Sequence, residues 1–112
     1  GEETVGYVFT TESNGYGGAM SIMTGISADG QITGINILSH NETPGLGANA
    51  TNESFRDQYK KPVPQSGFSV IKSGSPDDTQ ILAMTGATIT TDAVTNAVNL
   101  AVQQYETVKE EN

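Results

Sequence analysis

The sequence predicts an α+β fold in which a mainly antiparallel sheet packs against a C-terminal helix, with a second short helix between them along the chain. Two hairpin turn signals divide the first 40 residues into short β-rich runs. Apolar residues recur at helical spacing over residues 94–108, and 13 glycines indicate many turns rather than a helix bundle. A length of 112 residues suits one domain, so we expect residues 1–112 to form a single unit.

Three strands are expected in the first part of the chain, at 6–11, 19–26 and 32–38. Each is short and rich in β-branched or aromatic residues. The dipeptides Asn-Gly at 14–15 and Asp-Gly at 29–30 are typical of tight hairpin turns, and they separate the three runs. Because strands that follow one another usually pair, this order predicts an antiparallel meander.

The middle of the chain predicts a short helix and two short strands. Residues 48–59 suit a helix in which Phe55 and Tyr59 share one face, because they lie four residues apart. The Pro-Val-Pro sequence that follows ends this helix, since proline lacks the backbone donor and disfavours helix before it. Strands are expected at 67–72 and 79–84.

The last segment predicts a long amphipathic helix. Thr90 or Thr91 is expected as its N-cap, which would place Asp92 in the first turn, where the helix dipole favours an anion. Lys109 lies near the other end, where a cation is favoured. Six apolar residues fall on one helical face: Val94, Val98, Ala101, Val102, Tyr105 and Val108.

Charge and composition exclude several classes of function. Five basic residues face 13 acidic ones, a net charge of −8, which disfavours binding to nucleic acid or to an anionic membrane surface. No apolar stretch is long enough to span a bilayer, so no membrane span is expected within this chain. The absence of Cys excludes disulfides, Cys-ligated metal centres and a thiol nucleophile, and no metal site is expected.

Small and hydroxyl-bearing residues precede the long helix at 85–91, with the sequence Thr-Gly-Ala-Thr-Ile-Thr-Thr. Gly86 permits an unusual turn, and its small neighbours leave the backbone accessible. A group attached at Thr88 would face the free N–H groups of a helix N-terminus, which favours phosphate. An ordinary capping segment is the simpler interpretation, and these residues alone favour it.

A second segment of interest has the sequence Glu-Thr-Pro-Gly-Leu-Gly at 42–47. Pro followed by Gly suits the two central positions of a type II turn, which needs a positive φ at the glycine. Such a turn can hold Leu46 and exposed backbone amides against a flat ligand. Taken alone, these residues favour a plain connection between a strand and a helix.

Together, the segments at 42–47 and 85–90 resemble the motifs of the FMN-binding domain family. Either motif alone is moderately specific, but both in this order, about 40 residues apart, are a strong signal. The resemblance covers nearly the whole chain. Further matches fall on the family's opening strands, aromatic positions, middle strand and closing helix: residues 14–18, 25–26, 29–35, Phe55, Tyr59, 67–68, Lys72, 93–94 and 97–98.

The resemblance implies a protein that holds FMN. In this family a flavin transferase joins the FMN phosphate to the hydroxyl of the Thr that ends the Ser/Thr-Gly-Ala-Thr motif, which is Thr88 here. A phosphodiester lowers the phosphate charge by about one and prevents dissociation, which suits a chain with few cations. Eleven residues are expected at the cofactor: Thr85, Gly86, Ala87, Thr88, Thr90, Glu42, Thr43, Pro44, Gly45, Leu46 and Gly47.

The resemblance also implies a function, which is electron relay by covalent FMN in an Rnf-like or related membrane-associated redox chain, outside the cytoplasm. The partners would be the other subunits of that complex and, during maturation, the flavin transferase. The domain would be an electron carrier rather than a stand-alone enzyme. Thr88 would be an attachment point, and no catalytic residue is expected.

Two alternatives stay open. Family members usually carry Asp three residues before the Ser/Thr-Gly-Ala-Thr motif, and Leu82 occupies that position here. One alternative is therefore a noncovalent flavin-binding sensory or regulatory module, and the other is an accessory flavin domain of a larger reductase. Tyr7 and Tyr16 could stack on a flavin, although the residues favour packing within the sheet.

Overall fold

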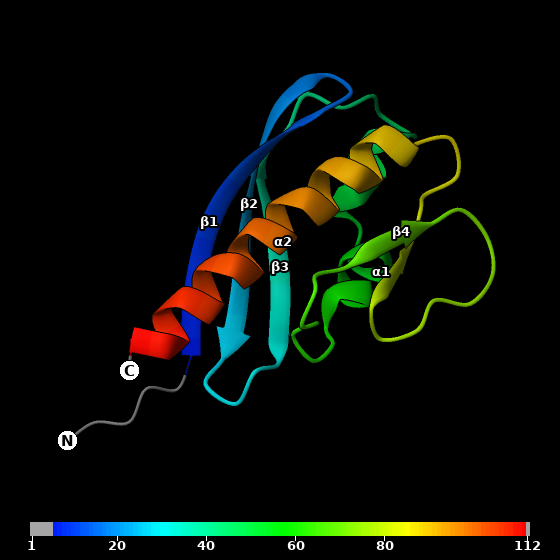
Figure 1. Ribbon diagram of the computed structural model, residues 1–112. Coiled ribbons are helices and arrows are strands. Elements are labelled where there is room, and N and C mark those ends of the chain that lie inside the picture. The colour runs from blue at the N-terminus through cyan, green and yellow to red at the C-terminus, as the bar shows by residue number, and fades with distance from the viewer. Residues whose placement is uncertain (1–5, 112) are drawn as a thin grey trace.

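A three-stranded antiparallel sheet carries the long C-terminal helix across one of its faces (Figure 1). The computed structural model describes residues 6–111. The strands are β1 (Gly6–Gly15), β2 (Gly18–Ser27) and β3 (Ile32–Ser39), paired in the order β1-β2-β3, and the helix is α2 (Thr88–Glu111). The predicted α+β fold, with its meander and C-terminal helix, is confirmed.

Alternation of side chains along the strands places the core between the sheet and α2. In β2, Met20, Ile22, Thr24 and Ile26 are buried, while the residues between them lie partly exposed on the other face. Strands β1 and β3 flank β2, so their apolar side chains join the same buried layer.

The first hairpin turns later than predicted. Strand β1 continues through residues 14–15, which pair with Ala19 and Gly18, so Tyr16 and Gly17 form the turn. The predicted turn at 14–15 is therefore wrong, because a buried carboxylate from a later segment binds the N–H groups of Tyr16 and Gly17, as described below. The second predicted turn, Asp-Gly, is confirmed between β2 and β3.

Helix α2 begins earlier than predicted. Thr90 and Thr91 lie inside the helix with buried side chains, so neither is the N-cap, and Asp92 falls beyond the first turn. The hydroxyl of Thr91 donates to the carbonyl oxygen of Ala87 at 2.9 Å, and its N–H donates to the same oxygen at 3.0 Å. Gly86, with φ +72°, turns the chain sharply enough for the helix to start immediately afterwards.

The predicted apolar stripe of α2 packs on the sheet. Two hydroxyls of β1 donate to carbonyl oxygens of α2, from Thr11 to Ala97 at 2.6 Å and from Ser13 to Ala93 at 2.5 Å. Five stripe residues are buried: Val94, Val98, Ala101, Val102 and Tyr105.

Within residues 6–111, no helix combines the length and the apolar character that crossing a membrane requires.

The helix predicted at 48–59 is split into three short helices. These are η1 (Gly47–Thr51), α1 (Glu53–Arg56) and η2 (Asp57–Tyr59). Asn52 breaks the helix between η1 and α1, because its backbone is extended, with φ −70° and ψ 140°. The segment therefore bends around the molecule instead of forming one rod.

Phe55 and Tyr59 share one buried face, as predicted. Their rings meet edge to face with centroids 5.7 Å apart, and Tyr59 meets Phe68 in the same way at 5.7 Å. The hydroxyl of Tyr59 lies 2.7 Å from Oγ1 of Thr95 on α2, so the two share a buried hydrogen bond. This cluster ties the short helices to α2.

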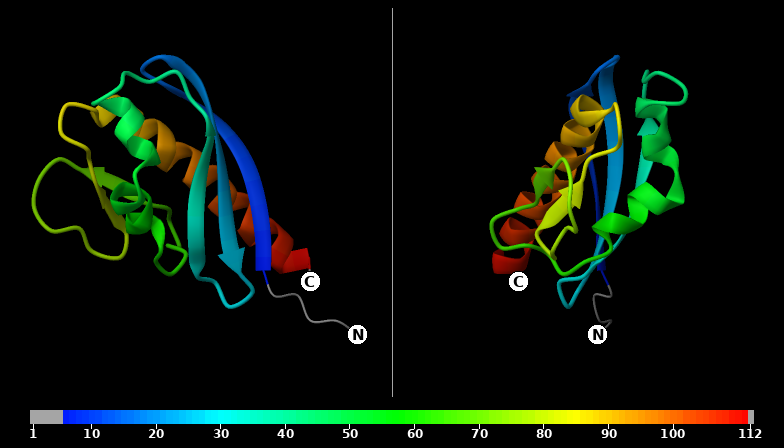
Figure 2. Two further views of the ribbon diagram at one scale, coloured as in Figure 1. Left: turned by 180° about the vertical axis from the view of Figure 1, so that it is seen from behind. Right: turned by 90° about the vertical axis from the view of Figure 1, so that its right-hand side faces the viewer.

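A second, parallel sheet is formed by β4 (Ser69–Ile71) and β5 (Gln80–Leu82). Both strands lie inside the predicted ranges 67–72 and 79–84, although each is shorter. The short helices and this sheet lie together beyond the β3 edge of the first sheet (Figure 2).

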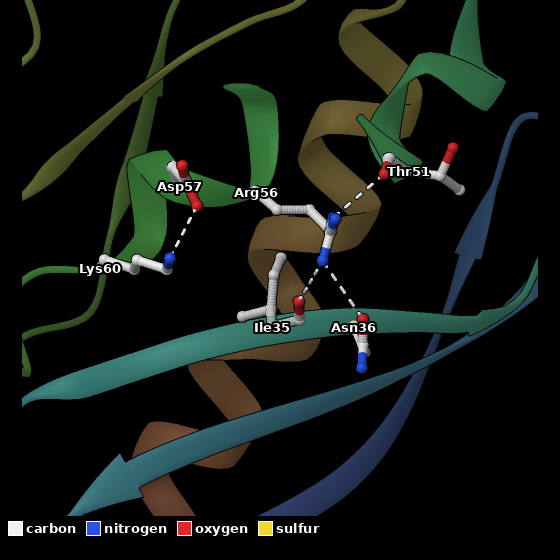
Figure 3. A network of polar contacts seen from close by, with 6 residues as sticks. All are labelled: Ile35, Asn36, Thr51, Arg56, Asp57 and Lys60. Carbon is white, nitrogen blue, oxygen red and sulfur yellow. Dashed lines mark hydrogen bonds and ion pairs between the residues drawn. The ribbon is translucent and has the colours of Figure 1, made fainter. Parts of the chain in front are cut away.

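Arg56 fastens the short helices to β3 (Figure 3). Its Nε donates to the carbonyl oxygen of Thr51 at 3.0 Å, and its Nη1 donates to that of Ile35 at 3.3 Å and to Oδ1 of Asn36 at 3.2 Å. Charged side chains from this region also line a shallow groove of about 400 Å³ over the outer face of the sheet. Because Arg56 is already bonded to the protein, this groove offers little free positive charge.

Thr24 provides a test of the core. Its hydroxyl is fully buried and, among the residues that the structure describes, has no hydrogen-bond partner. We expect Thr24→Val to leave the free energy of unfolding unchanged or to raise it by about 1 kcal/mol, because an unsatisfied buried hydroxyl is removed. Thr95→Val is the matched control, and it should lower stability by about 1 kcal/mol because it leaves the Tyr59 hydroxyl unpaired. Urea unfolding measures both, and a Thr24→Val protein less stable than Thr95→Val would contradict this description.

Candidate functional site

A cleft of about 460 Å³ opens where the start of α2 meets the segment before η1 and the β1–β2 turn. Its volume lies within the range of small-molecule sites. The fold therefore brings together the two segments singled out in the sequence, 42–47 and 85–91. Nine residues line the cleft: Tyr16, Thr43, Leu46, Gly47, Gly86, Ala87, Thr88, Ile89 and Thr90.

The buried carboxylate of Glu42 connects the three segments that form the cleft. Its Oε1 accepts hydrogen bonds from the N–H of Tyr16 at 2.8 Å and from the hydroxyl of Thr90 at 2.5 Å. Its Oε2 accepts one from the N–H of Gly17 at 2.7 Å. The Glu42 side chain is only 6% exposed and does not line the cleft. It therefore lies behind the wall and holds that wall together.

Hydrogen bonding keeps Glu42 ionised. Burial raises the pKa of its carboxyl, but the hydrogen bonds from Thr90, Gly17 and Tyr16 outweigh burial and leave the pKa below its usual value. At neutral pH the carboxylate is therefore an acceptor for all three donors. The backbone N–H of Glu42 donates to Nδ1 of His40 at 3.1 Å.

The Pro-Gly segment forms the predicted turn. Gly45 has φ +80°, and the N–H of Leu46 donates to the carbonyl oxygen of Thr43 at 3.1 Å, the two features of a type II turn. The turn carries the half-exposed side chain of Leu46 into the cleft opposite Gly86. A Cβ at Gly86 would lie 3.3 Å from Cδ2 of Leu46, so the two segments are in close contact.

Thr88 is the first residue of α2, partly exposed, and it lines the cleft. The first N–H groups of a helix have no partner within it. That of Thr91 donates to Ala87, whereas those of residues 88–90 have no partner among the residues that the structure describes. A hydroxyl therefore lies beside N–H groups and a helix dipole that favour an anion.

The structure places the other predicted site residues differently. Thr85, Pro44 and Gly45 are exposed and shape the two turns without lining the cleft. Ile89 lines the cleft but was not predicted there. The sequence signal that could have identified Ile89 is its apolar side chain at a position off the apolar stripe of α2. In the structure this side chain is 55% exposed.

Tyr16 also lines the cleft, and the packing within the sheet that the sequence favoured does not occur. It lies in the turn, outside the paired strands, and is 73% exposed. Tyr7 does pack on the sheet side, with its ring centroid 5.8 Å from that of Tyr105 and 6.1 Å from that of Phe9. Because the turn lies two residues later than predicted, Tyr16 falls in the turn while Tyr7 stays in the sheet.

Comparison with known proteins matches residues 15–103 to the FMN-binding domain family. The chain is 48% identical over 107 residues to the G subunit of the proton-translocating ferredoxin:NAD(+) oxidoreductase complex of Clostridium ljungdahlii, covering 96% of this chain and 57% of the relative. It is 45% identical over 106 residues to the G subunit of the Na(+)-translocating ferredoxin:NAD(+) oxidoreductase complex of Acetobacterium woodii, covering 93% and 51%. The chain thus spans about half the length of these relatives.

Solved structures show the same fold. The C subunit of the Na(+)-translocating NADH-quinone reductase of Parabacteroides distasonis superposes with a TM-score of 0.70 at 25% identity, covering 82% of this chain and 50% of that one. NqrC of Shewanella oneidensis superposes with a TM-score of 0.77 at 20% identity, covering 96% and 55%.

Gly17 tests the close packing behind the cleft. A Cβ at this position would overlap the carbonyl oxygen of Asn41 and lie 2.7 Å from its carbonyl carbon. We expect Gly17→Ala to lower the free energy of unfolding by about 2 kcal/mol, because backbone atoms must move apart. Gly34→Ala is the control, since its Cβ would meet nothing closer than Cε of Lys60 at 3.8 Å. Thermal unfolding compares them, and equal stability of the two variants would refute the packing.

The ionised state of Glu42 predicts a pH dependence of stability. Because its pKa is lower in the folded state, its contribution is fully present above the usual Glu pKa and is lost as pH falls through the folded value. We expect Glu42→Gln to lower the free energy of unfolding at pH 7 by about 2 kcal/mol, a difference that shrinks from about pH 5 downward. Urea unfolding from pH 7 to pH 3 measures it, with the exposed Glu53→Gln as control. Parallel wild-type and Glu42→Gln curves would be inconsistent with a charged Glu42.

Proposed function

This chain belongs to the FMN-binding domain family, and we propose that it holds FMN covalently through Thr88 and relays electrons in a membrane-associated redox complex. The observation that carries the proposal is the cleft itself. Both family motifs contribute residues that line it, and Thr88 lines it as the first residue of α2. When bound, FMN supplies reversible transfer of one or two electrons, while the protein sets its exposure and hydrogen bonding.

The polar groups at the start of α2 fit a phosphate that is esterified. None of the five basic residues of the chain lines the cleft, so no cation is in place to hold a free phosphate dianion. An ester to Thr88 reduces that charge, and the N–H groups of residues 88–90 can bind the remaining anion. Attachment therefore replaces the cationic clamp that the sequence lacks.

The apolar side chains of the cleft fit a flat ring. Leu46 and Ile89 contribute exposed aliphatic surface, and Tyr16 contributes an aromatic ring. The hydroxyl of Thr43, which also lines the cleft, could form a hydrogen bond with the edge of such a ring. Exposed apolar groups that converge on one cleft are typical of a ligand site rather than of an ordinary surface.

Attachment needs a separate enzyme. Formation of the ester joins Oγ1 of Thr88 to phosphorus, releases the hydroxyl proton and expels a leaving group from an activated FMN donor. No carboxylate, His or Lys lines the cleft within the described residues, so the chain offers no base for this step. We therefore assign the step to a flavin transferase.

Leu82, which stands where family members usually carry Asp, lies at the end of β5. The side chain of Gln58 forms hydrogen bonds with both backbone groups of Leu82.

The similarity to the G subunits of ion-translocating ferredoxin:NAD(+) oxidoreductases supports a place in such a complex. The partners would be its other subunits, and the domain would act outside the cytoplasm as an electron carrier rather than as a stand-alone enzyme. We propose that residues 1–112 form one FMN-binding domain.

Co-expression with a flavin transferase tests the attachment by intact mass. We expect the wild-type chain to gain the mass of one FMN less water, Thr88→Ala to gain nothing and Thr88→Ser to keep a fraction, because a hydroxyl remains. Thr107→Ala is the control, since it removes an exposed hydroxyl near the other end of α2, outside the cleft, and should be modified like the wild type. FMN on Thr88→Ala would overturn the assignment. A wild-type chain that stays unmodified yet takes up free FMN would support the noncovalent sensory module.

A further inference from the structure

Among the residues that the structure describes, Tyr16 is the one aromatic residue that lines the cleft, and it is 73% exposed. A large exposed aromatic beside a mostly apolar cleft has no partner surface to cover its ring. The chain contains no Trp, so no indole can take this place. Other aromatic side chains pack among themselves elsewhere, and they are Tyr7, Phe9, Phe55, Tyr59, Phe68 and Tyr105.

The turn that carries Tyr16 is fixed by Glu42. The two carboxylate oxygens bind the N–H groups of Tyr16 and Gly17 at 2.8 and 2.7 Å. Glu42 is buried, so moving the turn outward would leave a buried charge without donors, which is costly. The turn also cannot move inward, because Gly17 already lies against the backbone of Asn41. Tyr16 is therefore held on a rigid support.

The same carboxylate also fixes the opposite wall. Its Oε1 accepts the hydroxyl of Thr90 at 2.5 Å, in the first turn of α2 and two residues from Thr88. One buried charge thus sets the spacing between the turn that carries Tyr16 and the helix start that carries the attachment residue. A bound ring would lie between these two walls.

We propose that Tyr16 stacks against the flavin ring and that Glu42 is the positioning residue that holds it there. The inference rests on the proposed function, because it requires flavin in this cleft. Offset stacking between aromatic rings is favourable, and a phenol in contact with a flavin quenches its fluorescence by donating an electron to the excited state. Contact with Tyr16 therefore has a spectroscopic signature that folding alone does not produce.

The experiment uses protein loaded at Thr88, with occupancy fixed by intact mass so that fluorescence is compared per flavin. We expect Tyr16→Ala to raise the flavin fluorescence several-fold and to increase its quenching by added iodide. Tyr16→Phe should also be brighter, because the electron donor is lost, yet it should keep the wild-type protection from iodide, because a ring still covers the flavin. Leu100→Ala, an exposed apolar residue in another groove, is the control and should match the wild type.

Glu42→Gln tests the positioning role. The amide keeps the size of the side chain but can accept with only one of its two terminal atoms, so one of the turn bonds is lost. We expect brighter flavin and easier access by iodide, in the direction of Tyr16→Ala, whereas Glu53→Gln removes an exposed charge without either effect. Where Glu42→Gln is too unstable to load, the exposed Tyr16 variants decide the stacking. Amide exchange at Tyr16 and Gly17 in the loaded wild-type chain then decides the positioning role: slow exchange supports it, and fast exchange at both amides overturns it.

The outcomes separate this inference from the proposed function. Flavin on Thr88 with unchanged fluorescence and iodide access in Tyr16→Ala overturns the stacking and leaves the carrier standing. Changes in Tyr16→Ala that are absent from a folded, loaded Glu42→Gln overturn the positioning role. A wild-type chain that takes up no flavin at all overturns both proposals.

Discussion

The structure depends on one buried carboxylate. Glu42 draws together the β1–β2 turn, the segment before η1 and the first turn of α2, three parts of the chain that are far apart in sequence. A buried charge is tolerated only when its hydrogen bonds are made. Any movement that broke these hydrogen bonds would leave the buried charge without donors, which costs free energy. The three segments are therefore held in place, and they fix the shape of the cleft.

Three glycines allow this arrangement. A Cβ at Gly15 would lie 2.5 Å from Oε1 of Glu42, one at Gly17 would lie 3.0 Å from Oε2, and one at Gly47 would lie 2.9 Å from Cβ of Glu42. Each glycine thus leaves room for the carboxylate to approach a backbone. Gly86 and Gly45 serve a different purpose, because their positive φ angles build the turns that deliver Leu46 and Thr88 to the cleft.

Local patterns in the sequence predict most of the fold. The meander, the stripe of α2 and the Pro-Gly turn follow from spacing and turn chemistry, and the two motifs were expected at one site. The rest depends on long-range contacts. The hairpin turn moves to Tyr16 and Gly17 because Glu42, 25 residues beyond Gly17, binds there. For the same reason Glu42 lies behind the cleft instead of lining it, and Tyr16 lies in the cleft instead of in the sheet.

Amide hydrogen exchange at Tyr16 and Gly17, followed residue by residue by NMR at neutral pH, tests the central claim most directly. Both amides belong to an exposed turn, which exchanges quickly unless a buried acceptor protects it. If the carboxylate holds the turn, both exchange slowly in the wild-type chain, and at least one becomes fast when Glu42 is replaced by Gln in a protein that stays folded. Fast exchange at both amides in the wild-type chain would show that the turn is free, and the cleft would then need another explanation.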